Sequence, residues 1–448
     1  MRTAWIFGLL AWSVAAAPAT GPVVVSSNHR FLQFKDGTPF FWLADTGWLL
    51  FGQLDRPETL RYLDDRQHKG FNVIQVMLLH SPQMKTAGGA RALVGGDPAK
   101  PDTTPEGYWD HVDWVLGRAA ERGIWLGLVP AWGSVVKQGR LNNDNVVAYA
   151  TFLARRYRDK PNVFWIVGGD IPGDDHIDVW RLLGKTLKAE DPGHLITYHP
   201  IGRTQSSTWF HDEPWLDLNM FQSGHQRYDQ DTKSPRRYGE DNWRYVLDDY
   251  VRQPAKPVVD GEPSYENIPQ GLHDGTQPRW IAADCRRYAY WSVFAGAFGH
   301  TYGDNSIMQF YKQGGGRGSF TPINTWVDAL DDPGSGQMQF LKSLMLSRPY
   351  FERVPDQNAL AGENGARYDY VAVTRGTTYL FAYTYTGRPF RLRLGILSGG
   401  KVHAVWYAPR DGSERAIGEF ANEGTREFTP PGKPEPGNDW VLILDSVK

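Results

Sequence analysis

The sequence contains a single cysteine, Cys285, among 448 residues, so no disulfide can form within the chain. Cys285 lies in an apolar stretch with helical spacing, where we expect a buried and unreactive thiol. Basic residues are not in excess, with 48 Lys and Arg against 50 Asp and Glu, which argues against nucleic acid as a partner. Beyond the N-terminal segment, no apolar run approaches the roughly 18 residues that a membrane span requires.

Several catalytic motifs are also missing. No His-Glu-x-x-His or paired-cysteine pattern indicates a metal, and no Gly-x-Ser-x-Gly elbow indicates a serine hydrolase. The glycine-rich stretch 314–318 follows no expected strand, so it does not have the context of a phosphate-binding loop. The sequence therefore implies neither a metal nor a cofactor.

The first 19 residues have the pattern of a secretory signal peptide. Arg2 supplies a positive start, residues 4–14 are mostly apolar, and small residues at 15–19 offer cleavage sites. We therefore expect a secreted or periplasmic protein. A chain of this length exceeds the usual size of a single core, and we expect a larger domain over 20–350 and a smaller one over 351–448.

Apolar runs alternate with amphipathic stretches up to about residue 350. Eight runs indicate strands, at 40–45, 71–80, 124–130, 162–170, 194–199, 215–222, 257–262 and 298–302. Segments between them have helical spacing, and 326–346 is expected to be the last helix. This alternation predicts a (β/α)8 TIM barrel. A doubly wound open sheet is the alternative, but no glycine fingerprint follows the first strand.

After residue 350 the apolar pattern changes to period two. Short runs alternate in this way at 368–374, 379–385, 390–394, 402–407 and 440–444, and turn residues separate them. We therefore predict a small antiparallel β-sandwich at the C-terminus.

Two acids end corresponding strands of the predicted barrel. Asp170 ends the fourth strand and Glu262 the seventh, and the C-terminal strand ends build the active site of such barrels. Retaining hydrolysis of a glycosidic bond needs two carboxyl groups roughly 5–5.5 Å apart. We expect Glu262 to be the nucleophile. Asp170 would be the acid/base, with its pKa raised by the negative charge of Glu262.

Further polar and aromatic residues lie at the other predicted strand ends, where they would suit hydroxyl binding and stacking on a sugar ring. The predicted substrate-binding residues are Asp45, Trp48, His80, Trp132, His199, Asn219, Gln222, Tyr265, His300 and Tyr302, with Asp304 beside them.

Several longer stretches resemble the apiosidase-like glycoside hydrolases (glycoside hydrolase family 140), from about Ser26 to the C-terminus. They are Phe41–Trp48, Trp165–Asp170, Trp209–Trp215, Asp217–His225, Asp260–Pro263 and Gly296–Gly303. The resemblance implies a (β/α)8 barrel with an aspartate acid/base on strand four and a glutamate nucleophile on strand seven, which match Asp170 and Glu262. It also implies cleavage of apiofuranosyl linkages in the pectic polymer rhamnogalacturonan II. The C-terminal sandwich resembles a module labelled as collagen-binding, a label that we do not take as its function.

The fourth strand departs from the commoner barrel glycosidases, which place a glutamate there, usually after an asparagine. Here Gly168 and Gly169 precede Asp170. Aspartate is one methylene shorter, so the backbone must approach the substrate more closely, and glycines permit that approach. Asp170 could instead bind a hydroxyl, with the proton donor elsewhere. The reserve candidates for the donor are Asp260, Glu213 and Asp304.

Two classes of function follow from these observations. The first is an exported, retaining glycosidase that acts on a plant cell-wall glycan. The second is a barrel without catalytic activity that binds glycans or protein, with the sandwich as its anchoring module.

Overall fold

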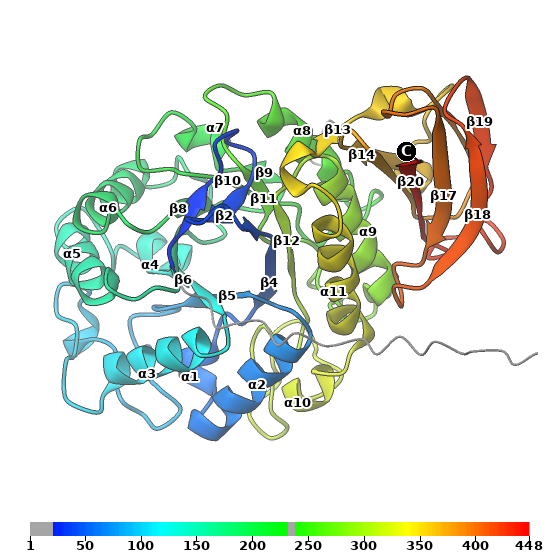
Figure 1. Ribbon diagram of the computed structural model, residues 1–448. Helices are drawn as coiled ribbons and strands as arrows, with labels where there is room; N and C mark the ends of the chain where they lie inside the picture. The colour runs from blue at the N-terminus through cyan, green and yellow to red at the C-terminus, as the bar shows by residue number, and fades with distance from the viewer. Residues whose placement is uncertain (1–20, 232–237, 448) are drawn as a thin grey trace, which may run out of the picture.

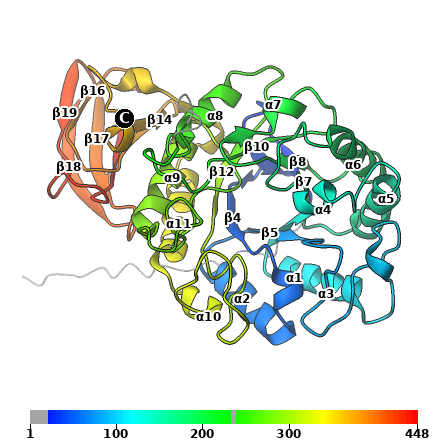
Figure 2. The same cartoon turned by 180° about the vertical axis from the view of Figure 1, so that it is seen from behind.

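The computed structural model describes residues 21–231 and 238–447. The predicted signal peptide, residues 1–19, lies outside the described residues. The described chain forms a barrel of parallel strands surrounded by helices, and a β-sandwich packs against one side of it (Figure 1 and Figure 2).

Eight parallel strands of the described chain form the barrel wall in the order of the sequence. They are β4 (Trp42–Thr46), β5 (Val73–Met77), β6 (Trp125–Val129), β7 (Val163–Gly168), β8 (Ile196–His199), β10 (Asn219–Gln222), β11 (Val258–Asp260) and β12 (Gly299–Tyr302). Strand β12 pairs with β4, and a hydrogen bond from Asp217 N to Ile196 O (2.9 Å) joins β8 to β10. Phe298 N donates to Val258 O (3.1 Å) between β11 and β12, which closes the ring. The predicted TIM barrel is confirmed, and the open sheet is excluded.

Helices surround this barrel, so its strands are buried on both faces and have continuous apolar sequences. The longer helices are α2 (Arg56–His68), α3 (Tyr108–Ala120), α5 (Val146–Tyr157), α6 (Ile177–Glu190), α8 (Asn242–Tyr250), α9 (Ala282–Phe294) and α11 (Pro333–Leu346). The short ones are α1 (Leu50–Gln53), α4 (Gly133–Lys137), α7 (Ser207–Phe210) and α10 (Trp326–Ala329). The prediction of one continuous last helix over 326–346 is wrong. The segment is divided into α10 and α11 because Pro333 lacks an N–H and is suited to the first turn of a helix.

A small antiparallel sheet covers the N-terminal ends of the barrel strands. It consists of β1 (Val23–Val25), β2 (Leu32–Phe34) and β3 (Pro39–Phe40). The ring of Phe40 packs edge-on against Trp125, with centroids 5.0 Å apart, and lies 5.8 Å from Phe164. These contacts close the N-terminal end with aromatic side chains and leave the C-terminal end for a pocket.

The C-terminal domain consists of two antiparallel sheets. Its strands are β13 (Val354–Pro355), β14 (Val371–Arg375), β15 (Tyr379–Thr384), β16 (Phe390–Arg393), β17 (Lys401–Tyr407), β18 (Glu414–Ala421), β19 (Thr425–Phe428) and β20 (Trp440–Val447). The larger sheet has the order β13-β14-β15-β20-β17-β18, and β16 pairs with β19. This confirms the predicted sandwich. The sequence does not predict strand β18. None of its residues is buried, so its sequence lacks the period-two alternation of apolar residues that indicates a strand.

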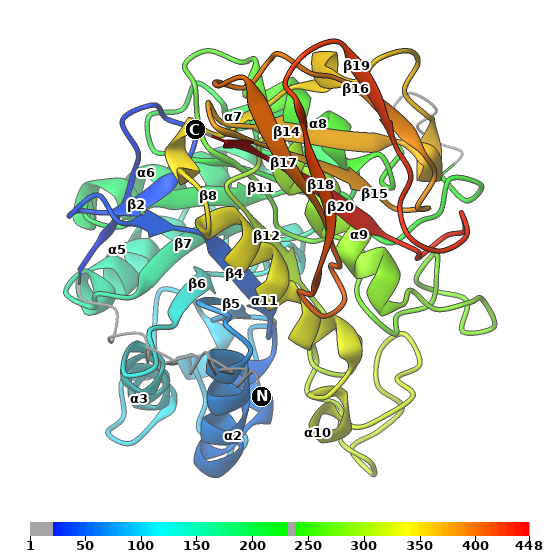
Figure 3. The ribbon, with the colours of Figure 1, turned by 45° about the vertical axis from the view of Figure 1, so that its right-hand side comes forward.

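The sandwich packs on α9 and α11 through a buried interface (Figure 3). Tyr383 stacks on Tyr290 of α9, with ring centroids 4.8 Å apart, and Tyr370 stacks on Trp243 at 4.1 Å. One hydrophobic core runs through barrel and sandwich without a break. We therefore expect the two domains to unfold together.

A buried ion pair in this interface predicts a large loss of stability on mutation. The carboxylate of Asp439 binds Nε and Nη2 of Arg286 at 2.8 and 2.9 Å, and these side chains are 0 % and 4 % exposed. Replacing Asp439 by alanine leaves the buried guanidinium without a carboxylate partner, with Gln337 as its neutral acceptor, so we expect the free energy of unfolding to fall by about 3–5 kcal/mol in urea titrations.

The matched control is Glu190→Ala, which breaks the exposed pair with Arg155 and should change the free energy of unfolding far less, because solvent screens exposed charges. Equal losses in the two variants would contradict the importance of the buried pair.

Candidate active site

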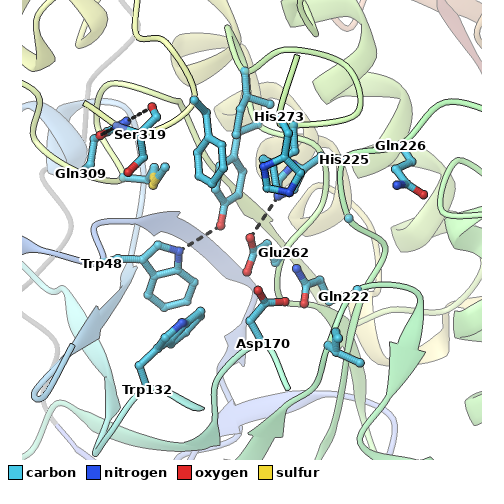
Figure 4. A pocket seen from close by; sticks show the side chains of 18 of the residues that line it. Trp48, Trp132, Asp170, Gln222, His225, Gln226, Glu262, His273, Gln309 and Ser319 are labelled. Carbon is cyan, nitrogen blue, oxygen red and sulfur yellow. Dashed lines mark hydrogen bonds and ion pairs between the residues drawn. The ribbon is translucent and has the colours of Figure 1, made fainter. Parts of the chain in front are cut away.

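A cavity of about 410 Å³ opens at the C-terminal ends of the barrel strands (Figure 4). Its wall includes seven of the residues predicted from the sequence, namely Trp48, His80, Trp132, Asp170, Gln222, Glu262 and Tyr265. Other lining residues come from the loops above the strand ends, among them Arg203, His225, His273, Gln309 and Phe320.

Asp170 lies two residues beyond the end of β7, on backbone that only glycine-rich sequence allows. A Cβ atom on Gly169 would lie 2.6 Å from the ring of Trp132, and one on Gly168 would lie 2.5 Å from the carbonyl oxygen of His199. Both distances are shorter than real contacts, so these positions require glycine. Gly169 N donates to His199 O (3.0 Å), and Asp170 itself has a left-handed φ of 55°. The two glycines thus let the backbone lie deep in the pocket.

Glu262 also lies two residues beyond its strand, β11, and its loop is held from two directions. From inside the barrel, the amide of Gln75 donates to Gly261 O at 2.7 Å. From the loop after β10, Gly224 N donates to Glu262 O at 3.0 Å. The hydroxyl of Ser264 returns a hydrogen bond to Gly224 O at 2.8 Å. These contacts fix the backbone from which the carboxylate projects.

Two imidazoles contact the carboxylate of Glu262. Nε2 of His199 lies 3.1 Å from Oε2, and Nε2 of His225 lies 3.1 Å from Oε1. Burial alone would raise the pKa of Glu262, but the hydrogen bonds and charges of the two histidines outweigh it and lower the pKa to about 2. Glu262 is therefore a carboxylate throughout the neutral pH range.

Asp170 faces Glu262 across the same pocket (Figure 4) and has the opposite shift. Solvent reaches its side chain through the cavity, but protein surrounds it on most sides. This burial, together with the negative charge of Glu262, raises the pKa of Asp170 to about 6. The two histidines and a hydrogen bond from Gln222 oppose the rise without cancelling it. Neighbouring carboxyl groups with pKa values pushed apart in this way can act as a proton donor and an ionised partner.

Aromatic rings fix the orientation of the two histidines. The indoles of Trp48 and Trp132 both lie 5.5 Å from the ring of His199. The ring of Tyr265 packs edge-on against His225 at 4.7 Å, and its hydroxyl accepts a hydrogen bond from Trp48 Nε1 at 3.2 Å. The imidazoles are thus held against Glu262 by ring packing as well as by their polar contacts with its carboxylate.

His199 contacts Glu262 but does not itself line the cavity. Four further residues predicted to bind substrate do not line the pocket either, and the prediction is corrected for them. Asp45 accepts a hydrogen bond from Tyr62 (2.6 Å) and lies 3.5 Å from Arg66 of α2, so it faces the helical layer. Asn219 begins β10 instead of ending it, and contacts His211 at 3.3 Å.

His300 and Tyr302 are the other two. His300 is 1 % exposed within β12, and burial lowers its pKa to about 3. The hydroxyl of Tyr302 donates to Glu266 at 2.6 Å, away from the pocket. A strand end identifies the rim of a barrel, but side chains there alternate between its interior and its outer layer.

The reserve proton donors also lie outside the pocket wall. Asp260 is buried and accepts hydrogen bonds from Ser223 and Asn242. Glu213 pairs with Arg181 at 2.7 Å on the outside of the barrel. Asp304 accepts from backbone N–H groups of its own loop. Each acid therefore has a local structural partner, which leaves Asp170 as the carboxyl group opposite Glu262.

The predicted site residues do not include several polar residues of the pocket, among them His225 and Arg203. His225 follows Gly224 in the loop after β10, and no periodicity or spacing marks it, although it lies in one of the stretches that carry the family resemblance. Arg203 follows β8 in a loop without a motif. Only the folded chain brings either residue to Glu262 and its pocket.

Residues 21–231 and 238–447 contain no cluster of three or more His, Cys, Asp or Glu residues arranged to bind a metal. Among the same residues, no helix is long and apolar enough to cross a membrane.

Two solved structures of known proteins are similar to this chain over nearly its whole length. A solved structure titled "Glycoside hydrolase" is 49 % identical, with a TM-score of 0.92, and the match covers 95 % of this chain and 97 % of that one. A second, titled as a glycoside hydrolase family 5 from Bacteroides vulgatus, is 47 % identical with the same TM-score and covers 95 % and 94 %. No curated protein matches. The fold and the pocket are those of a glycoside hydrolase.

Two segments of the chain match known protein families. Residues 26–352 match the family described as "Apiosidase-like, catalytic domain". Residues 354–445 match a family described as "Putative collagen-binding domain of a collagenase". The chain belongs to the apiosidase-like glycoside hydrolases and carries this second module at its C-terminus.

The coupling between the two carboxyl groups predicts a measurable pKa change. In Glu262→Gln the negative charge beside Asp170 is lost, so the pKa of Asp170 should fall below the value of about 6 in the parent protein. The causes that remain act in opposite directions, because burial raises the pKa while the two histidines and Gln222 lower it. Titration of the Asp170 carboxyl carbon by NMR measures both values. An unchanged pKa would show that the two groups do not interact.

Proposed function

We propose that the protein hydrolyses glycosidic bonds with retention of configuration, with Glu262 as nucleophile and Asp170 as acid/base. Glu262 attacks the anomeric carbon while Asp170 gives its proton to the leaving oxygen, and a covalent glycosyl–enzyme forms. Asp170 then removes a proton from water, which attacks the anomeric carbon and releases Glu262. The observation that carries this proposal is that Asp170 and Glu262 face each other in one pocket, with an imidazole 3.1 Å from each oxygen of Glu262. The opposite directions of their pKa shifts agree with these roles.

The histidines prepare Glu262 for this role. A nucleophile must be ionised, and the contacts from His199 and His225 keep the pKa of Glu262 low although it is buried. When Glu262 becomes an ester, its negative charge disappears and so does one cause of the raised pKa of Asp170. The pKa of Asp170 therefore falls in the intermediate, so its carboxyl group can stay ionised, as a general base requires. The opposite shifts also favour an enzyme over a barrel that only binds glycans or protein.

The roles of the two acids can be separated by leaving groups. Asp170→Asn removes the proton donor, so we expect the rate on substrates with a poor leaving group to fall by roughly 10²–10⁴-fold. With substrates whose leaving group needs no proton, the rate of the first step should fall much less in this variant. Glu262→Gln should lose activity on both kinds. If Asp170→Asn kept near-normal rates on both, Asp170 would not be the acid/base.

For the substrate, we propose a pectic glycan of the plant cell wall, with apiofuranosyl linkages of rhamnogalacturonan II as the bond cleaved. The family supports the apiose part, since residues 26–352 match the apiosidase-like catalytic domain. Pectic polymers also carry uronate carboxylates, and the pocket wall offers a cation to them.

That cation is Arg203, the one Lys or Arg among the described residues that line the pocket. Its Nε lies 3.1 Å from Asp231, and its side chain is 27 % exposed. Its backbone is fixed in a left-handed conformation with φ 64°, and its N–H donates to Gln222 O at 2.6 Å. A guanidinium held in this way can bind a planar carboxylate through two N–H groups.

Arg203 therefore predicts a preference for acidic substrates. On pectic oligosaccharides, Arg203→Gln should lower kcat/KM by roughly ten- to a hundredfold, the value of a hydrogen bond to a charged group. On the same oligosaccharides with reduced carboxyl groups, the variant and the parent should differ little. Arg203→Lys, which keeps the charge without the fork, should be intermediate. Equal losses on both substrates would contradict carboxylate recognition. Analysis of the products that the parent enzyme releases from the pectic oligosaccharides identifies the sugar.

We also propose that the enzyme is exported. The support is the signal-like pattern of residues 1–19, with its positive start, apolar centre and small residues at the cleavage sites. Export to the periplasm or the exterior would bring the enzyme to polymeric substrates.

A further inference from the structure

A tyrosine of the sandwich contacts the barrel loop that follows β10. Tyr368 lies in the turn Arg367–Asp369 before β14, and its hydroxyl donates to Oε1 of Glu240 at 2.8 Å. Its ring packs edge-on against Tyr228 at 5.5 Å. The guanidinium of Arg367 lies 5.0 Å from the same Tyr228 ring. Both Glu240 and Tyr228 belong to the loop between β10 and α8, so the sandwich contacts this loop directly.

Glu240 connects three parts of the molecule at one buried carboxylate. Oε1 also binds Nη2 of Arg287 on α9 at 3.0 Å, and both side chains are 0 % exposed. Oε2 accepts a hydrogen bond from Tyr228 N at 2.6 Å. A buried carboxylate is tolerated only when its oxygens are satisfied, so Glu240 holds the backbone of Tyr228 in one place relative to α9 and Tyr368.

Tyr228 is three residues beyond His225, which contacts Glu262. The carbonyl oxygen of His225 accepts hydrogen bonds from Gly271 N at 2.7 Å and from Trp280 Nε1 at 3.2 Å. Its Nε2 lies 3.1 Å from Glu262. The short segment that carries this imidazole is therefore held at His225 by the barrel loops and at Tyr228 by the Glu240 cluster.

We propose that Tyr368 is a positioning residue, through which the C-terminal sandwich holds His225 against Glu262. The module thereby takes part in catalysis as a structural support of the active-site loop, which differs from the binding role in its family's description. The effect on rate rests on the proposed function of Glu262, whereas the effect on the loop does not.

The proposal predicts which kinetic constants change. The titratable groups that face Glu262 are Asp170 after β7, His199 at the end of β8, His225 after β10, and Tyr265 in its own loop. Loosening His225 weakens one of the two contacts that keep Glu262 ionised. The acidic limb of kcat/KM against pH should then move to higher pH, and kcat should fall more than KM changes.

The variants are Tyr368→Phe, which keeps the ring on Tyr228, and Tyr368→Ala, which removes both contacts. We expect kcat to fall by roughly three- to tenfold in Tyr368→Phe, the size of couplings within one hydrogen-bond network, and further in Tyr368→Ala. The matched control is Tyr407→Phe, which also removes a hydroxyl bond from sandwich to barrel, to Phe340 O at 2.9 Å, but far from this loop. The control should keep the parent kcat and pH profile.

In a His225→Ala background, a change at Tyr368 should no longer move the acidic limb, because the side chain that it positions is gone. An equal shift in both backgrounds, or an equal effect of Tyr407→Phe, would overturn the positioning role.

Hydrogen exchange provides a readout that needs no activity. Deuterium uptake in peptides spanning 219–228 should rise in Tyr368→Ala and stay unchanged in Tyr407→Phe. Unchanged uptake in both would refute the proposal even if the enzyme were active. Raised uptake in Tyr368→Ala, combined with absence of glycosidase activity in the parent protein, would instead uphold the positioning role and refute the proposed function.

Discussion

The contact between two imidazoles and the carboxylate of Glu262 determines the electrostatics of the pocket. A buried carboxyl group without partners would take up a proton, because burial disfavours the charged form. His199 and His225, each 3.1 Å from a different oxygen, reverse that tendency and lower the pKa of Glu262. The resulting negative charge then contributes to the raised pKa of Asp170. One set of contacts therefore gives two neighbouring carboxyl groups different pKa values, so that between about pH 2 and pH 6 Glu262 is ionised while Asp170 holds its proton.

The rest of the structure holds this arrangement in place from several directions. The barrel brings the ends of β7, β8, β10 and β11 to one rim, and the glycines before Asp170 let its backbone enter the pocket. The indoles of Trp48 and Trp132 fix one imidazole, and Tyr265 packs on the other. On the far side of the loop after β10, a buried Glu240 joins α9 and the sandwich to the segment that carries His225. The C-terminal module and the barrel share one core and, at this loop, one network of hydrogen bonds.

The sequence predicts the barrel and the position of the acids because both follow from local patterns. An apolar run, two glycines and an acid define the end of β7, and a similar run before Glu262 defines the end of β11. Local pattern does not decide which way a side chain points. It therefore predicts Asp45 and Tyr302 in the pocket, although Arg66 and Glu266 hold them in the outer layer. It also says nothing of contacts between distant segments, which is why His225 and Tyr368 carry no signal of their role. Their importance arises from folding the chain around Glu262 and Glu240.

The assignment of Glu262 as nucleophile requires a covalent bond between its carboxylate and the sugar. The most direct measurement is mass spectrometry of the protein after reaction with an activated glycoside that carries fluorine at C2, which slows hydrolysis of the intermediate by destabilising the positive charge of the transition state. We expect a mass increase of one glycosyl group, located by proteolysis on the peptide that contains Glu262, and no such adduct in Glu262→Gln. An adduct on another carboxylate, or turnover to a product of inverted configuration, would contradict the assignment.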